Sequence, residues 1–173
     1  MEKKRVTKTF KVYEIVALMN WYEGFYESKL KELPIKTQWL LDKNIGAIAV
    51  DARDFMTFRE GIMKKIQEKY FTDEKAEDFE TEQKDEKGNV VKDENGKVVM
   101  QKLKKVKDEF LKEYQKELEG INKELESVAS EEKDYTISLI DVDELIEKLP
   151  DGSDIDIDDL NMIAAFSKGN DSE

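Results

Sequence analysis

Carboxylates are the residues of this chain best suited to chemistry. The 173-residue sequence holds 41 Asp and Glu but no histidine and no cysteine. Imidazole is the usual general base and the commonest metal ligand, and both disulfides and thiolate metal sites need cysteine. A site must therefore be built from carboxylates, hydroxyls, amines and aromatic rings, and no catalytic signature appears among them. We expect a non-enzymatic protein without a cofactor or a resident metal.

The densest group of carboxylates lies near the C-terminus, at Asp154, Asp156, Asp158 and Asp159. These side chains could chelate a divalent ion, but the loop lacks the bend glycine and the closing glutamate of a calcium site. Asp156 and Asp159 are also spaced to cap a final helix. The sequence favours capping and solubility, with an acidic partner-binding surface as the alternative.

A short internal duplication, DEKGNVVK at 85–92 and DENGKVVM at 93–100, carries further carboxylates. Asp at the start of each copy and glycine three positions later favour a type I turn followed by a bulge, and the paired valines favour strands. Neither copy has the ligand spacing of an EF-hand. We predict a small β-meander at residues 79–101, with residues 79–84 as its first strand.

Glu109, Glu113 and Glu117 form an i, i+4 row on a predicted helix. Rows of this kind bind Mg²⁺ in some nucleotide pyrophosphatases, where pairs on facing helices converge. The facing helix offers no matching acidic pair here, so a solvated face with weak ion pairs is favoured.

Two long helices, at residues 34–70 and 102–128, must position these groups. Apolar residues recur at alternating steps of three and four in both segments, which predicts one apolar stripe on each helix. A single antiparallel register joins the stripes and pairs Ile48 with Ile121 and Ile66 with Leu103. We therefore expect a hairpin of two long helices.

An aromatic-rich helix at residues 13–30 precedes the hairpin. It carries two adjacent apolar stripes, one of which contains Leu18, Trp21 and Phe25. Either both stripes pack within the chain, or this stripe is a partner-binding or self-association surface. The segments 7–12 and 135–139 alternate as strands, and Asp141 and Glu144 have capping-box spacing before a short helix.

These elements define the expected fold class: mainly α, with an antiparallel long-helix hairpin, an N-terminal helix, a small β-meander at the hairpin tip and a short strand-helix-helix C-terminal module. The expected segments are 1–33, 34–130 with a β insertion at 79–101, and 131–173, within one cooperative domain. Residues 167–173 resemble a disordered tail.

The net charge of −12 is unevenly distributed. Residues 1–72 hold 14 basic and 10 acidic side chains, whereas residues 131–173 hold 3 and 14. The acidic end repels nucleic acid and attracts a basic protein. No run of residues approaches the length of a membrane span, and the lysine-rich start lacks the apolar segment of a signal peptide. We expect no membrane contact and no direct nucleic-acid binding.

The layout resembles an uncharacterised family of small phage and prophage proteins. The shared features are the Leu33–Pro34 entry into a long helix, the Asp-Glu-x-Gly connection, the return helix, and a closing strand and helix that end in DLNMIAAF. The resemblance implies a phage origin and expression in the cytoplasm of a bacterial host. It implies no activity and no site residues.

Three functions are open at this point. The first is a non-catalytic protein that binds a phage or host protein, in virion assembly or against a host or defence component. The second is an acidic mimic of nucleic acid that inhibits a DNA- or RNA-processing enzyme, and the third is a carboxylate-metal phosphoesterase. The candidate partner-binding residues are Leu18, Trp21, Phe25, Asp154, Asp156, Asp158 and Asp159, and self-association through the aromatic stripe is a further possibility.

Overall fold

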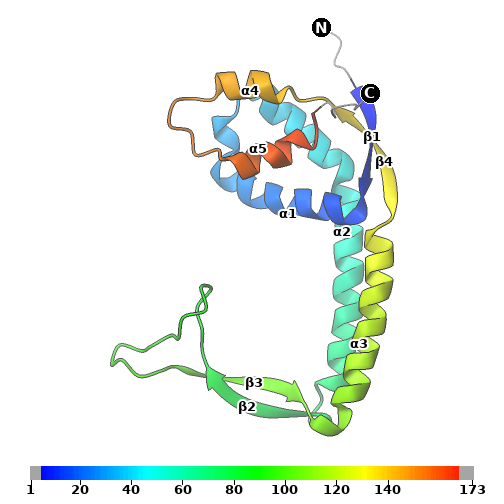
Figure 1. Cartoon of the computed structure of the whole chain (residues 1–173), viewed down its shortest axis with the longest axis vertical. Helices are drawn as coiled ribbons and strands as arrows, with labels where there is room; N and C mark the ends of the chain where they lie inside the picture. Colours follow the sequence, from blue (N-terminus) through cyan, green and yellow to red (C-terminus); the bar gives the residue numbers. More distant parts are fainter. Residues whose placement is uncertain (1–4, 168–173) are drawn as a thin grey trace. The chain divides into compact units, whose positions relative to one another are not determined.

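A computed structural model describes residues 5–167, and this part of the protein is mainly helical with two small antiparallel sheets (Figure 1). The expected mainly-α class is therefore confirmed. The expected tail at 167–173 falls outside the described residues except for Ser167. In chain order the elements are β1 (Arg5–Lys11), α1 (Val12–Ser28), a 3₁₀ turn (Leu30–Glu32), α2 (Ile35–Tyr70), β2 (Ala76–Glu82), β3 (Met100–Val106), α3 (Asp108–Ala129), β4 (Glu132–Ser138), α4 (Val142–Lys148) and α5 (Ile157–Ala164).

The chain divides into two compact units. Unit 1 contains the chain up to Phe58 and again from Glu126, and unit 2 contains Arg59–Leu125. This division differs from the three consecutive segments expected from the sequence, because both boundaries fall inside long helices. The first and last parts of the chain belong to one unit because their strands pair.

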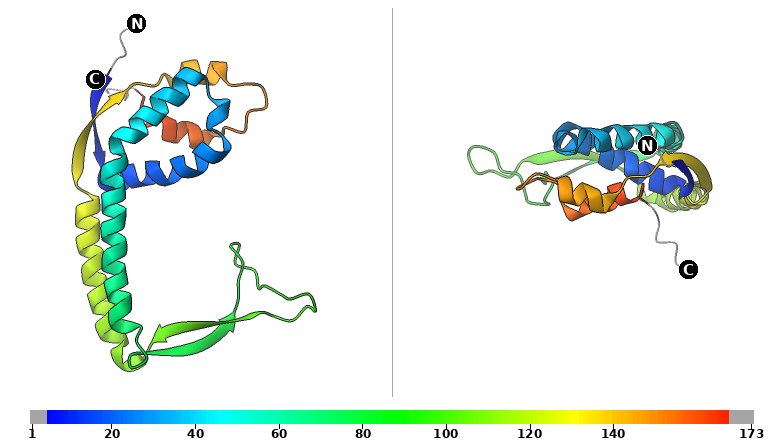
Figure 2. Two further views of the ribbon diagram at one scale, coloured as in Figure 1. Left: turned by 180° about the vertical axis from the view of Figure 1, so that it is seen from behind. Right: turned by 90° about the horizontal axis from the view of Figure 1, so that it is seen from above.

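Unit 1 is closed by a two-stranded sheet in which β1 and β4 run antiparallel, from Arg5 opposite Ser138 to Lys11 opposite Glu132 (Figures 1 and 2). The alternating patterns at 7–12 and 135–139 predicted both strands, and the structure adds their pairing. Alternate side chains of β4 face the core: Tyr135 is 7% exposed and Ile137 is 1% exposed. A strand with one buried face has a strongly specified register, because a slip by one residue would turn its apolar side chains to water.

The core of unit 1 is assembled from α1, the first half of α2, β4 and α5. Its completely buried side chains include Ile15, Leu41, Ile48, Ile163 and Phe166. α5 contacts both α1 and α4 (Figure 1). α5 therefore covers part of α1, although more than 120 residues separate these two helices along the chain.

One buried polar side chain links α2 to β4 in this core. Asn44 is 1% exposed, its Nδ2 donates to the Ser138 carbonyl at 2.7 Å, and its Oδ1 accepts the Ser138 N–H at 2.8 Å. Because a buried backbone group left without a partner is costly, Asn44 satisfies the edge of β4 where no further strand is present among the described residues.

Unit 2 contains the last turns of α2 and most of α3, which are joined by side-chain contacts. The Tyr70 hydroxyl donates to Glu113 at 3.1 Å and to Glu117 at 2.7 Å, and Lys69 pairs with Glu117 at 2.6 Å. The Tyr70 and Tyr114 rings also meet edge to face, with centroids 5.2 Å apart. Two of the glutamates in the i, i+4 row therefore hold the helix pair together.

These contacts show that the predicted helix register is wrong in unit 2. It is wrong in unit 1 as well, because Asn44 and Asp51, on either side of Ile48, contact β4. It placed Leu103 opposite Ile66, but Leu103 lies in β3 opposite Phe79. The observed pairing is displaced from the predicted one by roughly four helical turns, each of about 3.6 residues. The displacement follows from the connection: residues 102–106 form a strand, so α3 begins at Asp108 and not at residue 102.

The predicted β-meander is also corrected. β2 pairs directly with β3 as an antiparallel ribbon, from Ala76 opposite Val106 to Glu82 opposite Met100. The duplicated segment between them forms two tight loops, each closed by an isolated bridge, Lys84 with Val90 and Lys92 with Val98. Figure 2 (left) shows the ribbon leaving the end of the helix pair, with both loops at its far end.

The two loops meet the ribbon at a three-way backbone junction. The Val91 N–H donates to the Gln83 carbonyl, the Gln83 N–H to the Val99 carbonyl, and the Val99 N–H to the Val91 carbonyl, each at 2.8–2.9 Å. Gln83, Val91 and Val99 are therefore eight residues apart, which is the period of the duplicated sequence. The predicted turn chemistry is confirmed, because Gly88 and Gly96 have φ of +82° and +76°.

Candidate protein-binding surface

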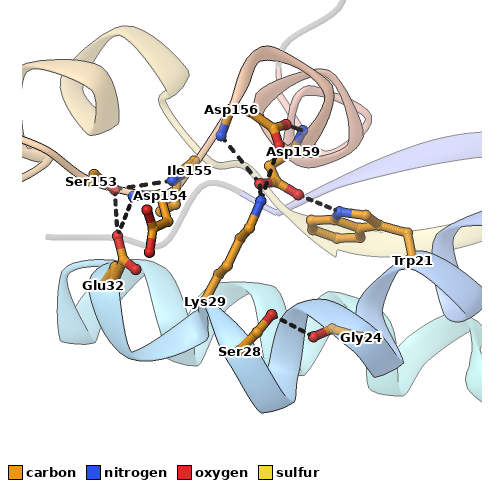
Figure 3. Close-up of polar contacts among 10 residues, drawn as sticks. All are labelled: Trp21, Gly24, Ser28, Lys29, Glu32, Ser153, Asp154, Ile155, Asp156 and Asp159. Carbon is orange, nitrogen blue, oxygen red and sulfur yellow. Dashed lines mark hydrogen bonds and ion pairs between the residues drawn. The ribbon is translucent and has the colours of Figure 1, made fainter.

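A charged cluster fixes α5 to the end of α1 (Figure 3). The Lys29 ammonium lies 2.7 Å from Asp159 Oδ2 and 3.0 Å from Asp156 Oδ2, and Trp21 Nε1 donates to Asp159 Oδ1 at 2.9 Å. We call Trp21, Lys29, Asp156 and Asp159 the Lys29 cluster. Hydrogen bonds to Asp159 and then Asp156 raise the pKa of Lys29, so its ammonium stays charged at neutral pH.

The two aspartates of this cluster also cap α5, as the sequence predicts. Asp156 accepts the Asp159 N–H at 2.9 Å, and Asp159 accepts the Asp156 N–H at 3.2 Å. The backbone N–H of Asp159, followed by Lys29, lowers the pKa of Asp156. A neighbouring contact extends the same seam: Glu32 accepts from Ser153 Oγ at 2.6 Å and from the Asp154 N–H at 2.9 Å (Figure 3).

The structure buries most of the aromatic stripe proposed as a partner surface. Leu18 and Phe25 are each 3% exposed and belong to the core of unit 1. Trp21 packs against that core, stacks near Phe25 at 4.6 Å between centroids, and donates to Asp159. Leu18 and Phe25 are therefore covered by the chain itself, and Trp21 is partly covered.

The four C-terminal carboxylates do not form a uniform acidic row. Asp159 is buried, whereas Asp154, Asp156 and Asp158 are exposed. Asp156 and Asp159 are both engaged by Lys29. Within residues 5–167, no group of three or more acidic side chains is arranged to hold a metal ion.

Exposed apolar side chains that a partner could use lie on the β2–β3 ribbon of unit 2. Only the base of the ribbon is buried, where Ala76 and Val106 are each 5% exposed. Beyond the base, Leu103 is 43% exposed and Met100 is 52% exposed, and Phe79, opposite Leu103, is half-buried. The loops add Val90 and Val98, at 37% and 39% exposed.

Charge is separated between the two strands of this ribbon. β2 (AEDFETE) carries four acidic side chains and no basic one, whereas β3 (MQKLKKV) carries three lysines and no acidic one. One cross-strand pair, Lys105 with Glu77, is 2.9 Å apart, and Lys104 reaches Asp73 at 2.9 Å. Each edge of the ribbon therefore has a charge of its own, and β2 presents the acidic edge.

The sequence reasoning missed this surface because it assigned residues 102–106 to a helix. Leu103 and Val106 fit the i, i+3 spacing of the following helix, and that spacing concealed the strand. A usable signal was the contrast between the acidic segment at 76–82 and the lysine-rich segment at 100–106, because opposite charges on facing strands stabilise a hairpin.

The described residues contain no helix that is long and apolar enough to cross a lipid bilayer. No protein-family model, no curated protein and no solved structure matches this chain.

Proposed function

We propose that this is a non-catalytic protein that binds another protein through its β2–β3 ribbon. The observation that carries the proposal is the exposure of Met100 and Leu103, with Val90 and Val98 on the loops, on a ribbon whose outer part has no packing partner among the described residues. An isolated two-stranded ribbon is marginally stable in water, and free strand edges pair readily with another chain. A bound protein supplies both the missing packing and the missing strand neighbour.

The charge of the ribbon indicates the kind of partner. The ribbon and its loops, residues 76–106, hold 8 acidic and 7 basic side chains, but β2 carries four acidic and no basic side chains along a free strand edge. A partner with an extended, lysine- or arginine-bearing segment gains backbone hydrogen bonds along β2 and complementary charge beside them. Its association rate falls with added salt, because exposed charges are screened.

The end of α2 and the start of α3 support the ribbon in this proposal. The Tyr70–Glu113–Glu117 contacts and the buried Ala76–Val106 base anchor it to the helix pair. Binding residues held on a rigid support lose less entropy on association. The resemblance to small phage and prophage proteins further suggests a phage protein of the host cytoplasm, acting in virion assembly or on a host or defence component.

The acidic-mimic alternative receives less support. It requires a row of free carboxylates at residues 154–159, but Lys29 engages Asp156 and Asp159, and Asp159 is buried. The phosphoesterase alternative requires acidic side chains from facing helices, and Glu113 and Glu117 are used as acceptors for Tyr70. We therefore retain the protein-binding function.

Affinity capture from phage-infected cells tests the proposal. The bait is compared with Met100→Glu/Leu103→Glu, which places one charge on each face of the ribbon without touching its buried base. Ile157→Glu is the matched control, because Ile157 is 68% exposed in unit 1. We expect one protein to bind the wild type and the control with equal affinity and to lose at least tenfold affinity for the ribbon variant. Equal affinity for all three would refute the ribbon as the binding surface.

A further inference from the structure

Unit 1 contains a groove that the ribbon does not use. It has a volume of about 650 Å³ and lies between the start of α2 and the β4–α4 segment. We call it the α2–α4 groove. Its lining is mostly apolar, and its rim includes Ile35 and Trp39, which are 84% and 43% exposed. This volume is within the range of sites that enclose small molecules.

A buried hydroxyl without a partner lies in the lining of this groove. Ser138 is 2% exposed, and its Oγ has no hydrogen-bond partner among the described residues. Its backbone groups are satisfied by Asn44, so only the hydroxyl is left. Buried hydroxyls normally have a partner, and an unsatisfied one costs about 1–3 kcal/mol. A ligand that accepts a hydrogen bond would supply that partner.

The charges around the groove distinguish an anion from a cation. The first backbone bond of α2 is made by the Gln38 N–H, so the helix offers no acceptor to the N–H groups of the three preceding residues, which line the groove. The first turn of α2 has no acidic side chain and contains Lys36. A helix N-terminus of this kind favours a negative charge.

The two acidic side chains of the lining have partners within the protein, and Lys36 also acts on Glu144. Asp141 caps α4 by accepting the Glu144 N–H at 3.0 Å, and Glu144 pairs with Lys148. Both carboxylates therefore have cationic or N–H partners within α4 or at its start.

We propose that the α2–α4 groove binds an aliphatic carboxylate, a small molecule with an alkyl chain and one carboxylate group. The chain lies against Trp39 and the other apolar walls. The carboxylate accepts from Ser138 Oγ and from the N–H groups at the start of α2, with Lys36 beside it. This site belongs to unit 1 and does not depend on the ribbon proposed above.

Octanoate is the probe that tests this site, and the two tryptophans make the test specific. Trp39 lines the groove, whereas Trp21 donates to Asp159 in the Lys29 cluster. In ¹⁵N–¹H spectra, we expect octanoate to shift the Trp39 indole signal saturably and to leave the Trp21 indole signal in place. Octyltrimethylammonium, which has the same chain and the opposite charge, should bind at least tenfold more weakly.

Variants assign the polar contacts. We expect Ser138→Ala and Lys36→Gln each to weaken octanoate binding about fivefold, and Lys31→Gln, an exposed lysine outside the groove lining, to leave it unchanged. Lys36 is exposed, so its variant keeps the fold. The proposal is overturned if octanoate shifts neither indole signal or both alike, if the cationic probe binds as tightly, or if both groove variants bind octanoate like the wild type.

Discussion

At the scale of single residues, unit 1 depends on a few buried polar contacts between segments far apart in sequence. Asn44 bridges α2 and β4 by two hydrogen bonds to Ser138. Asp51 lies about two turns further along the same face of α2. It pairs with Lys133 at 2.7 Å and accepts from the Tyr135 hydroxyl at 2.7 Å. Lys133, followed by Tyr135, lowers the pKa of Asp51.

Asn44→Ala tests the buried bridge. The substitution removes two hydrogen bonds and leaves the Ser138 N–H and carbonyl buried without partners, so we expect the free energy of unfolding to fall by about 2–4 kcal/mol. Urea titration followed by tryptophan fluorescence measures the change in unit 1, because both tryptophans lie there. Asn20→Ala, at an exposed position of α1 in unit 1, should change stability by less than about 0.5 kcal/mol. Similar losses for both variants would contradict the role of Asn44.

The pH dependence of stability follows from the carboxylates. The folded pKa values of Asp51 and Asp156 are lowered below the unfolded value of 3.8, so their contribution is complete above that value and is lost as the pH falls through the folded pKa. There is no histidine to titrate near neutrality. We expect the unfolding free energy to be constant between about pH 5.5 and 8 and to fall below about pH 4.

Urea titrations across that pH range check this expectation. Lys29→Met should reduce the acid-dependent part, because the ammonium of Lys29 contributes to the lowered pKa of Asp156. A transition centred near pH 6.5 would show that another group controls stability.

At the scale of elements, local chemistry was easier to predict than pairing. The capping of α5 by Asp156 and of α4 by Asp141, and the turns at Gly88 and Gly96, all follow from short-range spacing and are all observed. The capping contacts and turn types depend on residues two to four positions apart, so the sequence contains the whole interaction.

Replacing glycine with alanine should destabilise the tight loops of unit 2 and stabilise helix α2. Gly88→Ala and Gly96→Ala force an L side chain into positive φ, so we expect each to destabilise its loop by about 1 kcal/mol. Gly61 lies in α2 with open space around its Cα, and Gly61→Ala should stabilise the helix by about 0.5–1 kcal/mol.

Hydrogen exchange of individual amides separates these effects. The Val91 and Val99 N–H groups at the three-way junction should exchange about fivefold faster in the loop variants, because about 1 kcal/mol corresponds to that factor. The amides around position 61 should exchange more slowly in Gly61→Ala. Unchanged exchange at the junction would mean that the positive-φ glycines do not hold it together.

There is a physical reason why the sequence alone does not determine the register of the two long helices. A stripe of apolar residues repeats every three to four positions, so sliding one helix by about four turns restores the same match of stripes. The length of the connection selects among these registers, and residues 102–106 form part of that connection. The exposed ribbon face was hidden by the same error, since Leu103 was counted with the helix. The burial of Leu18 and Phe25 was one of two alternatives that the stripe itself could not separate.

At the scale of the whole molecule, two strands more than 120 residues apart in the sequence, β1 and β4, meet in one sheet. Thr7 and Thr136 face each other across β1 and β4, and both are exposed. The Val12 N–H to Glu131 carbonyl bond sets the alternation, which makes Thr7–Thr136 one of the closer, non-hydrogen-bonded pairs. A cysteine pair at these positions therefore meets the geometry of a disulfide.

The chain has no cysteine of its own, so Thr7→Cys/Thr136→Cys gives one possible bridge. We expect it to form on mild oxidation and to raise the unfolding free energy by about 4 kcal/mol, because it closes a long loop in the unfolded chain. The control Thr7→Cys/Asp134→Cys is offset by two residues and should remain reduced. A thiol assay after oxidation measures how much of each pair has formed a disulfide. Equal oxidation of the two pairs would contradict the β1–β4 register.

The two proposals place protein binding on the ribbon of unit 2 and small-molecule binding in the groove of unit 1. Hydrogen-exchange mass spectrometry of the protein, alone and in complex with its captured partner, tests the binding assignment most directly. We expect new protection across residues 76–106, strongest in β2, and no change in the amides of α5 or of the α2–α4 groove. Protection confined to unit 1, with the ribbon exchanging as fast as in the free protein, would contradict it.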